Sequence, residues 1–511
     1  MAKFYITTAI VYANAAPHIG FAYEVIASDT LARFKRFQGH DVKFVSGMDE
    51  HSANVEKKAK SLGLEPQVYC DQVSETYKKL FYQYGISNDV FIRTTEPRHH
   101  KAAQAMVEAV NKKGDVYKGH YEGWYCSSCE AFYQEKDLKG KDCPVHQRPT
   151  EWLKEDNYFF ALSKYGEELR KYIESHPEFI QPSSRRNEVL RVIEGGLQDI
   201  SISRSTFKWG IPFPLEASHV IYVWFDALVN YLSAIGYPEE GYKAYWPADV
   251  HIVGKDITRF HCVIWPAMLM SAGIPLPKQV YGHGFLNIGG EKISKSRGNV
   301  VDPVAFGEKY GVDVVRYFLL REIVWGEDGD FSEEALVSRR NSDLADDLGN
   351  LVSRVLSMVD RYCAGKMPTL GMKCAEDDEA LQRKAEEVWG KFAKLLEAMN
   401  FSGSLAKIWE LVRMANQYVD KQAPWKLSKD LSMKGRLDTV LNQSSEAVVA
   451  VATMIAPFMP STAESILAQA GLDPVVVLVP DLYTKPLVWP RLKGGESVKK
   501  SPPMFPKESN Q

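Results

Sequence analysis

Four residues of this chain have the types and spacing of a zinc site. Cys126 and Cys129 form one pair with a two-residue gap, and Cys143 and His146 form a second pair further along. Each gap lets both ligands of a pair face one ion, and three thiolates with one imidazole close a tetrahedral set. Coincidental cysteines in a loop are the alternative, which these offsets disfavour. The pattern therefore predicts one structural zinc ion.

The tripeptide His18-Ile19-Gly20 stands between an apolar stretch and a helical pattern. A helix N-terminus presents free N–H groups and a favourable dipole to phosphate. Glycine lets a ligand approach the backbone closely, and the imidazole of His18 has a donor for a phosphate oxygen. A capping or turn histidine is the competing interpretation, and for the tripeptide alone it is the stronger one.

A second candidate for phosphate binding is Lys292-Ile293-Ser294-Lys295-Ser296, which follows the turn at Gly289-Gly290. Two lysines three residues apart, with serines between them, form a cationic loop suited to a polyphosphate. A solvated surface loop explains this segment equally well. The choice depends on whether the rest of the fold brings this loop to the residues around His18.

The elements around these residues predict a doubly wound parallel sheet. Residues 4–11 are β-branched and aromatic, residues 21–38 have apolar positions at helical spacing, and residues 42–45 indicate a second strand. This βαβ unit is typical of a Rossmann-like α/β domain. The pattern breaks at about residue 114 and resumes with predicted strands at 219–223 and 250–253.

The changes in pattern divide the chain into segments, with an all-α part at the end. Leu344, Leu348, Leu351 and Val355 lie on one stripe of a predicted helix. The predicted segments are the first half of the Rossmann-like domain (1–113), a connective insertion with the zinc knuckle (114–215), the second half (216–285), the lysine loop and a linking segment (286–345), a helical bundle (346–490) and a flexible tail (491–511).

Composition and charge exclude several classes of protein. Of 511 residues, 45% are hydrophobic and 25% are charged, as in an ordinary globular protein and unlike a disordered or collagen-like chain. The formal net charge of −3 means that a nucleic acid would be bound by a local basic surface. An odd count of seven cysteines indicates a reducing compartment. The sequence has no apolar run long enough for a membrane span, and its N-terminus is like a strand and unlike a signal peptide. We therefore expect a cytoplasmic protein.

The His18 tripeptide, the zinc knuckle and the lysine loop, in this order, resemble class I aminoacyl-tRNA synthetases, specifically the methionyl-tRNA synthetase family. The resemblance runs from about residue 4 to about residue 490. The family signature usually has a second histidine where this chain has Phe21, so we expect activity with altered ATP contacts there. Supporting segments are Met48-Asp49-Glu50-His51, Ile202-Ser203-Arg204, Tyr222-Val223-Trp224-Phe225-Asp226-Ala227, Gly254-Lys255-Asp256-Ile257, His283-Gly284-Phe285 and Ala423-Pro424-Trp425.

The resemblance implies that Mg-ATP activates methionine to methionyl-adenylate and pyrophosphate, and that methionine then passes to the 3′-terminal ribose of initiator and elongator tRNA. It assigns His18, Lys292 and Lys295 to neutralising charge on the phosphates. It assigns Asp49 to the substrate ammonium and Arg204 to ordering the same pocket. Further implied contacts are Gly20, Glu24, Gly254, Asp256 and His283, with a side-chain pocket of Ala9, Ile10, Tyr12, Trp224, Ala227, Tyr231, Ile257, His261 and Trp265.

The resemblance also implies that the helical bundle binds the tRNA anticodon. Asn350, Arg354 and Trp425 match anticodon-contacting positions, the tryptophan as a platform on which a base stacks. Without the match, a solvated helix flank and a core tryptophan are the better interpretations. An insertion of about 100 residues leaves no room for a large editing domain. No further domain follows residue 490, and we expect a monomer.

Three rival functions stay open from the sequence. Another class I synthetase, such as that for cysteine or leucine, would share the signatures. A non-catalytic RNA-binding relative would account for Phe21, although His18, Asp49 and both lysines are retained. A small-molecule nucleotidyltransferase would share the first signature, but the zinc knuckle and helical bundle argue against it. Pyrophosphate exchange with a panel of amino acids separates the synthetases.

Overall fold

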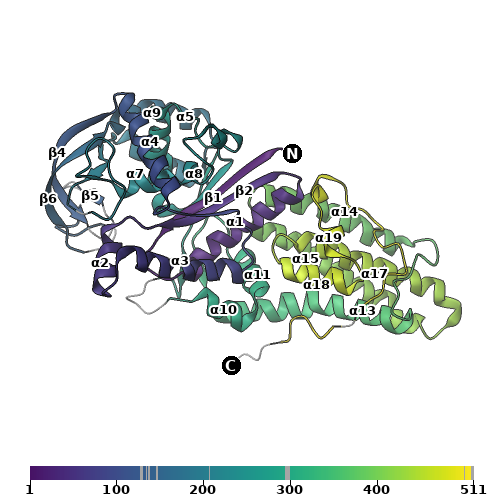
Figure 1. Ribbon diagram of the computed structural model, residues 1–511. Coiled ribbons are helices and arrows are strands. Elements are labelled where there is room, and N and C mark those ends of the chain that lie inside the picture. The colour runs from purple at the N-terminus through teal and green to yellow at the C-terminus, as the bar shows by residue number, and fades with distance from the viewer. Residues whose placement is uncertain are drawn as a thin grey trace.

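A parallel sheet lies at the centre of the computed structural model, which describes residues 1–126, 131–133, 135, 138–144, 148–206, 208–293, 300–499 and 501–507. The described strands follow the order β3-β2-β1-β11-β12-β7, and Figure 1 shows the long β1 and β2 beside each other. Their bounds are β1 (Lys3–Tyr12), β2 (Asp41–Asp49), β3 (Val90–Arg93), β7 (Ile180–Gln181), β11 (Val250–Gly254) and β12 (Val280–His283). The order reverses between β1 and β11, as in a Rossmann-like domain, which confirms the predicted parallel sheet.

Alternate residues of the strands are buried in two separate cores. In β1, Ile6 belongs to one core and Tyr5 to the other, and in β2 Phe44 and Val45 divide in the same way. A sheet buried on both faces is typical of parallel strands joined by helices. The helices with residues in the first core include α1 (Ile19–Phe37), α2 (Ala53–Ser61), α3 (Pro66–Gln83) and α11 (Val312–Glu322), and those in the second include α4 (Pro97–Lys112) and α9 (Trp265–Ala272).

Helix α1 begins two residues before the predicted start. The side chain of His18 accepts a hydrogen bond from the backbone N–H of Phe21 at 3.3 Å and so caps the first turn. The helix ends at Phe37, and Gly39 follows with a φ of +78°, a conformation that favours glycine. The capping role that the sequence left as an alternative for His18 is therefore observed, and its ring stands at the helix N-terminus.

The insertion is built on an antiparallel sheet of β4 (Val116–Cys126), β5 (Ala131–Tyr133), β6 (Glu151–Phe160) and β8 (Ile200–Ser201). It also contains α5 (Gly166–Ser175) and α6 (Ser183–Glu194). The short strand β7 lies between these helices and pairs with β12. The predicted segment 114–215 therefore does not fold wholly apart from the catalytic domain, because it supplies an edge strand to the central sheet.

The strand predicted at 219–223 is shorter in the structure. Only Val220–Ile221 forms β10, which pairs with β9 (Ser203–Arg204). Tyr222 is already the N-cap of a helix, and its backbone N–H donates to Ile202 O. Two helices follow at once, α7 (Val223–Leu228) and α8 (Asn230–Ser233). The predicted strand was too long because periodicity alone does not distinguish a short, fully buried strand from a buried helical segment.

The start of the lysine loop belongs to a small sheet, because Lys292 ends one of its strands. Its described strands follow the order β14-β13-β15, with β13 (Leu286–Ile288), β14 (Glu291–Lys292) and β15 (Gly329–Phe331). Gly289 and Gly290 have φ values of +61° and +75° and form the predicted turn. Residues 294–299, including Lys295, lie outside the described residues, as does the side chain of Lys292. The linking helices are α10 (Pro303–Tyr310) and α12 (Glu333–Arg339).

The C-terminal part is a helical bundle on one side of the catalytic domain (Figure 1). A π-helical stretch, Arg340–Gly349, leads into its first helix, and Leu344, Leu348, Leu351 and Val355 are buried as predicted. The helices are α13 (Asn350–Tyr362), α14 (Glu376–Glu397), α15 (Phe401–Gln422), α16 (Pro424–Leu427), α17 (Lys434–Ile455), α18 (Pro460–Gln469) and α19 (Pro474–Val477).

The segment expected to be a flexible tail instead packs on the bundle in its described part. Met367 exchanges backbone hydrogen bonds with Glu496 and Gly495, and Leu492 and Phe505 are buried. The proline and lysine content of residues 491–511 predicted a flexible tail, but apolar residues of this segment pack against the bundle. Within the described chain, no helix combines the length and the apolar character needed to cross a bilayer.

Candidate active site

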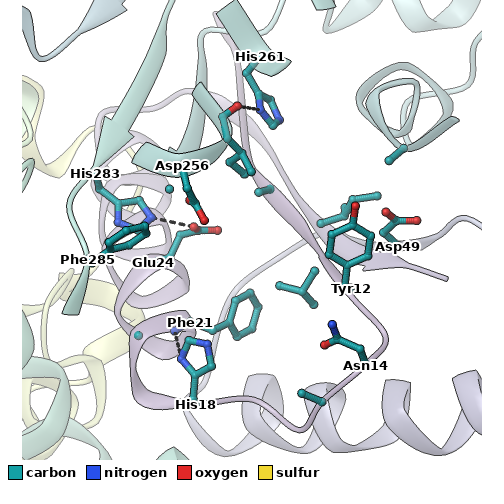
Figure 2. A pocket seen from close by; sticks show the side chains of 18 of the residues that line it. Tyr12, Asn14, His18, Phe21, Glu24, Asp49, Asp256, His261, His283 and Phe285 are labelled. Atoms are coloured by element: carbon teal, nitrogen blue, oxygen red, sulfur yellow. Dashed lines mark hydrogen bonds and ion pairs between the residues drawn. The ribbon is translucent and has the colours of Figure 1, made fainter. Parts of the chain in front are cut away.

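A cavity of about 370 Å³ opens where the parallel strands end. Tyr12 and Asp49 are the last residues of β1 and β2 and are paired in register, and Gly254 and His283 hold the same places in β11 and β12. The carboxyl ends of parallel strands, where strand order reverses, form the crevice in which such folds bind ligands. Figure 2 shows Tyr12 and Asp49 on one side of the cavity and Glu24 and His283 on the other.

The sheet brings most of the predicted site residues to this one cavity. They come from segments that are far apart in the sequence and meet because the strand ends are neighbours. Predicted residues in the walls are Ala9, Ile10, Tyr12, His18, Gly20, Glu24, Asp49, Trp224, Ala227, Tyr231, Gly254, Asp256, Ile257, His261 and His283.

One end of the cavity is aromatic. Trp224 stacks on Phe260 with ring centroids 3.8 Å apart, and the ring of Tyr12 meets Trp224 edge-on at 5.5 Å. Helix α7 positions Trp224, and the stretch after β11 positions Phe260. Flat, polarisable rings of this kind suit an apolar side chain, and a thioether in particular.

His261 is a neutral polar group beside these rings. Its Nδ1 lies 2.9 Å from the carbonyl oxygen of Ile257, so Nδ1 carries the proton and donates to it. Its Nε2 lies 2.6 Å from the hydroxyl of Tyr231 and accepts from it. Burial lowers the pKa of His261 to about 4. The aromatic end is therefore uncharged at neutral pH, except for the carboxylate of Asp49 at its edge.

The opposite end carries an ion pair. Nε2 of His283 lies 2.8 Å from Oε2 of Glu24, and Nδ1 of His283 donates to Gly284 O at 2.8 Å. Burial favours the neutral imidazole, but the hydrogen bond and charge of Glu24, the hydrogen bond to Gly284 and the charge of Asp256 together outweigh it and raise the pKa of His283. Figure 2 shows Asp256 beside this pair. The pair links α1 to the end of β12, so it fixes the floor of this end of the cavity.

The described start of the lysine loop lies close to His18 at the N-terminus of α1. A Cβ atom on Gly20 would lie 3.1 Å from the ring of His18 and 3.7 Å from Cδ1 of Ile293. Ile293 also lines the cavity. The lysine loop, whose second residue is Ile293, therefore reaches the helix N-terminus. This placement supports the phosphate interpretation over an isolated surface loop.

Two predicted pocket residues lie behind the walls. The guanidinium of Arg204 donates to Glu155 at 2.8 and 3.1 Å and lies over the ring of Tyr125 at 4.7 Å. A buried arginine needs a carboxylate partner, and here that partner belongs to the insertion. Trp265 is fully buried, with its ring 6.0 Å from that of Tyr231. Both residues therefore support the pocket indirectly.

Several wall residues were not predicted from the sequence. Tyr77 reaches the cavity from α3, and its hydroxyl donates to Ala15 O at 3.1 Å. Leu228, which was not among the predicted residues, also lines the wall. A hydrophobic helix face carries no signal that one of its residues meets a ligand. The walls also include Val11, Asn14, Ala15, Ala16, Phe21, Tyr77, Leu228, Asn230, Gly284, Phe285, Leu286 and Ile293.

The predicted zinc ligands are only partly described. Cys126 ends β4 and Cys143 lies in the following turn region, and both side chains are buried. Cys129 and His146 lie outside the described residues. Two buried thiols at the base of the same loop fit the chemistry of a thiolate-bound metal.

The predicted anticodon residues lie on one side of the bundle. Arg354 on α13 is 5.7 Å from the ring of Trp425 on α16, and it pairs with Asp420 on α15 at 2.6 Å. The amide of Asn350, one turn earlier, donates to Asn416 on α15 at 3.3 Å. The structure therefore brings all three residues to the α13–α15–α16 region, and Trp425 is partly buried there.

Known proteins share this architecture over the whole chain. The family model "tRNA synthetases class I (M)" matches residues 4–150 and 138–356, and the model "Anticodon binding domain of methionyl tRNA ligase" matches residues 367–510. The methionine–tRNA ligase of Thermotoga maritima is 47% identical over 99% of this chain and 80% of its own length. That of Caldanaerobacter subterraneus is 48% identical over 99% of this chain and 78% of its own length.

A solved structure agrees with the sequence relatives. Mycobacterium tuberculosis methionyl-tRNA synthetase, in complex with methionyl-adenylate, superposes with a TM-score of 0.94 at 42% identity, covering 99% of this chain and all of that one. A Rossmann-like sheet with this cavity at its switch point, followed by a helical bundle, defines a class I aminoacyl-tRNA synthetase. Within that class, the chain belongs to the methionyl-tRNA synthetases and is a methionine–tRNA ligase.

Proposed function

We propose that this methionine–tRNA ligase carries out its first step in the cavity at the strand ends. A carboxylate oxygen of methionine attacks the α-phosphorus of ATP, and the bond to the bridging oxygen breaks to release pyrophosphate. The ribose hydroxyl of tRNA then attacks the acyl carbon, loses its proton, and expels AMP. One observation carries this proposal: the cavity joins an uncharged aromatic end to a helix N-terminus.

The aromatic end is assigned to methionine. Asp49, buried at the end of β2, receives the ammonium group through a charge-assisted hydrogen bond. Tyr12, Trp224 and Phe260 surround the thioether, and neutral His261 adds no competing charge. The ammonium group is common to all amino acids, and an apolar pocket discriminates weakly against near-isosteres, so the preference for methionine depends on the shape of the aromatic end.

The other end is assigned to Mg-ATP, the co-substrate. Gly254 ends β11 and Asp256 follows it, and both meet the ribose, while Glu24 and His283 form the floor beside it. Gly20 lets the phosphates approach α1, where the helix dipole and His18 favour negative charge. Lys292 and Lys295 neutralise the charge that develops on the leaving pyrophosphate. Phe21 contributes no polar contact, so these groups carry the phosphate side.

Pyrophosphate exchange with a panel of amino acids tests the assignment. Methionine should support exchange, and isoleucine, leucine, valine and cysteine should support far less. Asp49→Asn should raise the KM for methionine about tenfold or more, since one charge-assisted hydrogen bond is lost, with little change in the KM for ATP. An Asp49→Asn enzyme with an unchanged KM for methionine would contradict the proposed orientation of the substrate.

A structural zinc ion held by Cys126, Cys129, Cys143 and His146 is part of the proposal. Burial of the Cys126 and Cys143 side chains supports it. Bound zinc would cross-link the loop and supply no open position for chemistry. Metal analysis should find about one zinc per chain, and far less in Cys126→Ala/Cys129→Ala. A wild-type protein prepared without chelator that contained no zinc would refute the site.

The helical bundle is assigned to the anticodon of the initiator and elongator methionine tRNAs. Arg354 and Trp425 lie within 5.7 Å of each other, and Asn350 is one turn away, so the three form one surface. We also propose a monomer in the cytoplasm. Seven cysteines among 511 residues are too few for a disulfide-stapled protein, which fits a reducing compartment. Light scattering of the purified protein measures the oligomeric state.

A further inference from the structure

A buried carboxylate lies directly behind the aromatic end of the cavity. Asp226 is on α7, whose neighbouring residues Trp224 and Ala227 line the walls, and its own side chain is fully buried. The cavity walls do not include Asp226, so substrate does not reach it. Its carboxylate accepts two hydrogen bonds, one from each of two buried histidines.

The first histidine belongs to the segment that carries Asp49. Nδ1 of His51 lies 2.8 Å from Oδ2 of Asp226, and His51 follows Asp49 by two residues. The same segment is held elsewhere by Trp209, whose Nε1 donates to Glu50 O at 2.6 Å. The bond between His51 and Asp226 joins this segment directly to α7, the helix on the other side of the methionine end.

The second histidine extends the network to two more helices. Nε2 of His99, on α4, lies 2.6 Å from Oδ1 of Asp226, and Nδ1 of His99 lies 2.8 Å from the hydroxyl of Ser233 on α8. Asn230 and Tyr231, on the same helix as Ser233, line the cavity. One carboxylate therefore connects the strand end of β2 with three helices, two of which form cavity walls.

The electrostatics keep Asp226 charged. Burial opposes the charge, but the interactions with His51 and His99 outweigh it and lower the pKa of Asp226 to about 2. A second ring near His51, that of His100, lies 5.3 Å away, and burial lowers the pKa of His100 to about 4. A fixed negative charge with two directional donors holds its partners more firmly than a neutral group would.

We propose that Asp226 is a positioning residue for the amino-acid subsite: through His51 and His99 it sets the place of Asp49 relative to the aromatic wall on α7 and α8. The inference rests on the proposed function, because it takes Asp49 as the acceptor of the substrate ammonium. In the proposed subsite, Asp49 binds the ammonium group of methionine and the aromatic rings bind its side chain. A shift between those two groups therefore weakens methionine binding and leaves the ATP end unaltered.

Pyrophosphate-exchange kinetics on the full chain test the proposal. Asp226→Asn keeps the shape but removes the charge, and it should raise the KM for methionine about tenfold, the equivalent of one charge-assisted hydrogen bond. The KM for ATP should stay within about twofold. The matched control is Asp378→Asn, another buried carboxylate, which accepts from Tyr418 and Arg436 in the bundle. It should lower the melting temperature without changing either KM.

A pair of variants at His51 separates positioning from folding. Asn places a donor where Nδ1 of His stands, so His51→Asn should keep a KM for methionine near the wild-type value, whereas His51→Ala should raise it as Asp226→Asn does. Both variants fill less space than histidine, so a loss of packing alone would affect both. Equal KM values for the two His51 variants, or an unchanged KM in Asp226→Asn, would overturn the proposal.

The proposed function fails in a different way. If Asp49→Asn leaves the KM for methionine unchanged, the ammonium assignment is wrong whatever Asp226 does. If Asp49→Asn raises that KM and Asp226→Asn does not, the subsite stands and only the positioning role is wrong.

Discussion

At the residue scale, the phosphate end differs from the family signature at one position. The ring of Phe21 is buried and meets Tyr77 edge-on at 5.1 Å, with Phe81 at 6.1 Å. It therefore extends an aromatic cluster between α1 and α3 instead of presenting an imidazole to ATP. In the proposed ATP site, neutralisation of the phosphate charge then depends on His18, the helix N-terminus and the lysine loop.

Lys295 should matter most while negative charge builds on pyrophosphate. Lys295→Ala is expected to slow adenylate formation on the order of a hundredfold, because it removes one cationic contact to the transition state. The KM for methionine should change little. Rapid-quench measurement of adenylate formation gives the rate directly. A wild-type rate combined with a raised KM for methionine would assign the lysine to ground-state binding instead.

His261 should make folding stability depend on pH. Its pKa is about 4 in the folded protein against an ordinary value of 6.5, so the unfolded chain binds a proton first as the pH falls. The contribution of His261 to the free energy of unfolding is therefore complete above pH 6.5 and is lost progressively between pH 6.5 and 4. It should amount to about 2 kcal/mol between pH 7 and pH 5.

Urea unfolding of wild type and His261→Gln at both pH values measures this contribution. The variant should lose less stability than the wild type on going from pH 7 to pH 5. His251, a neighbouring buried histidine, is present in both proteins, so its own titration cancels in the comparison. Equal losses of stability in the two proteins would show that His261 accepts a proton in the folded protein as readily as in the unfolded chain.

At the scale of elements, one buried arginine joins the catalytic domain to the bundle. Arg316 on α11 pairs with Asp29 on α1 at 2.8 Å, and it donates to Phe458 O at 2.8 Å and Pro457 O at 3.1 Å, in the connection between α17 and α18. All of these groups are buried. Helix α1, which begins at the phosphate end of the cavity, is thus bonded through α11 to the bundle.

Arg316→Met should lower the free energy of unfolding by about 3–5 kcal/mol, because it leaves the carboxylate of Asp29 buried with one cation fewer. Denaturant unfolding at pH 7 measures the change. Arg383→Met breaks an exposed pair with Glu379 and serves as the control; it should cost less than about 1 kcal/mol. Similar losses in the two variants would mean that Arg316 is not a buried cross-link.

At the scale of the whole molecule, the proposed sites for the small substrates and for the tRNA anticodon are separate. The proposed site for methionine and ATP is the cavity, and the proposed anticodon surface lies on the bundle beyond α11 (Figure 1). Activation of methionine needs only the first place, and charging needs both. Variants on the bundle surface should therefore alter charging selectively, provided that they leave the packing of α11 against the bundle intact.

Trp425→Ala should raise the KM for tRNA about tenfold or more, since stacking on one base is worth about 1–3 kcal/mol. Pyrophosphate exchange, which needs no tRNA, should stay nearly unchanged. Trp425 is partly buried, so the melting temperature of the Trp425→Ala variant should be measured on the same preparation. Parallel loss of exchange, charging and stability would identify it as a core residue instead of a stacking platform.

The sequence by itself determined the class of fold, the family and most of the cavity. These follow from local patterns: strand and helix periodicity, the glycine in the first turn of α1, and three motifs in a fixed order. Motif residues are recognisable because the chemistry demands particular side chains, as at His18 and Asp49. The shortened strand at Val220–Ile221 shows the limit of such patterns, since a short apolar run fits strand and helix alike.

Only the tertiary structure decided which side chains meet. It placed Arg204 and Trp265 behind the cavity and Tyr77 in its wall, and it packed the described part of 491–507 onto the bundle. It also brought His51 and His99, from distant segments, to Asp226. Such contacts depend on how strands and helices pack across the chain, and no spacing between neighbouring residues encodes them.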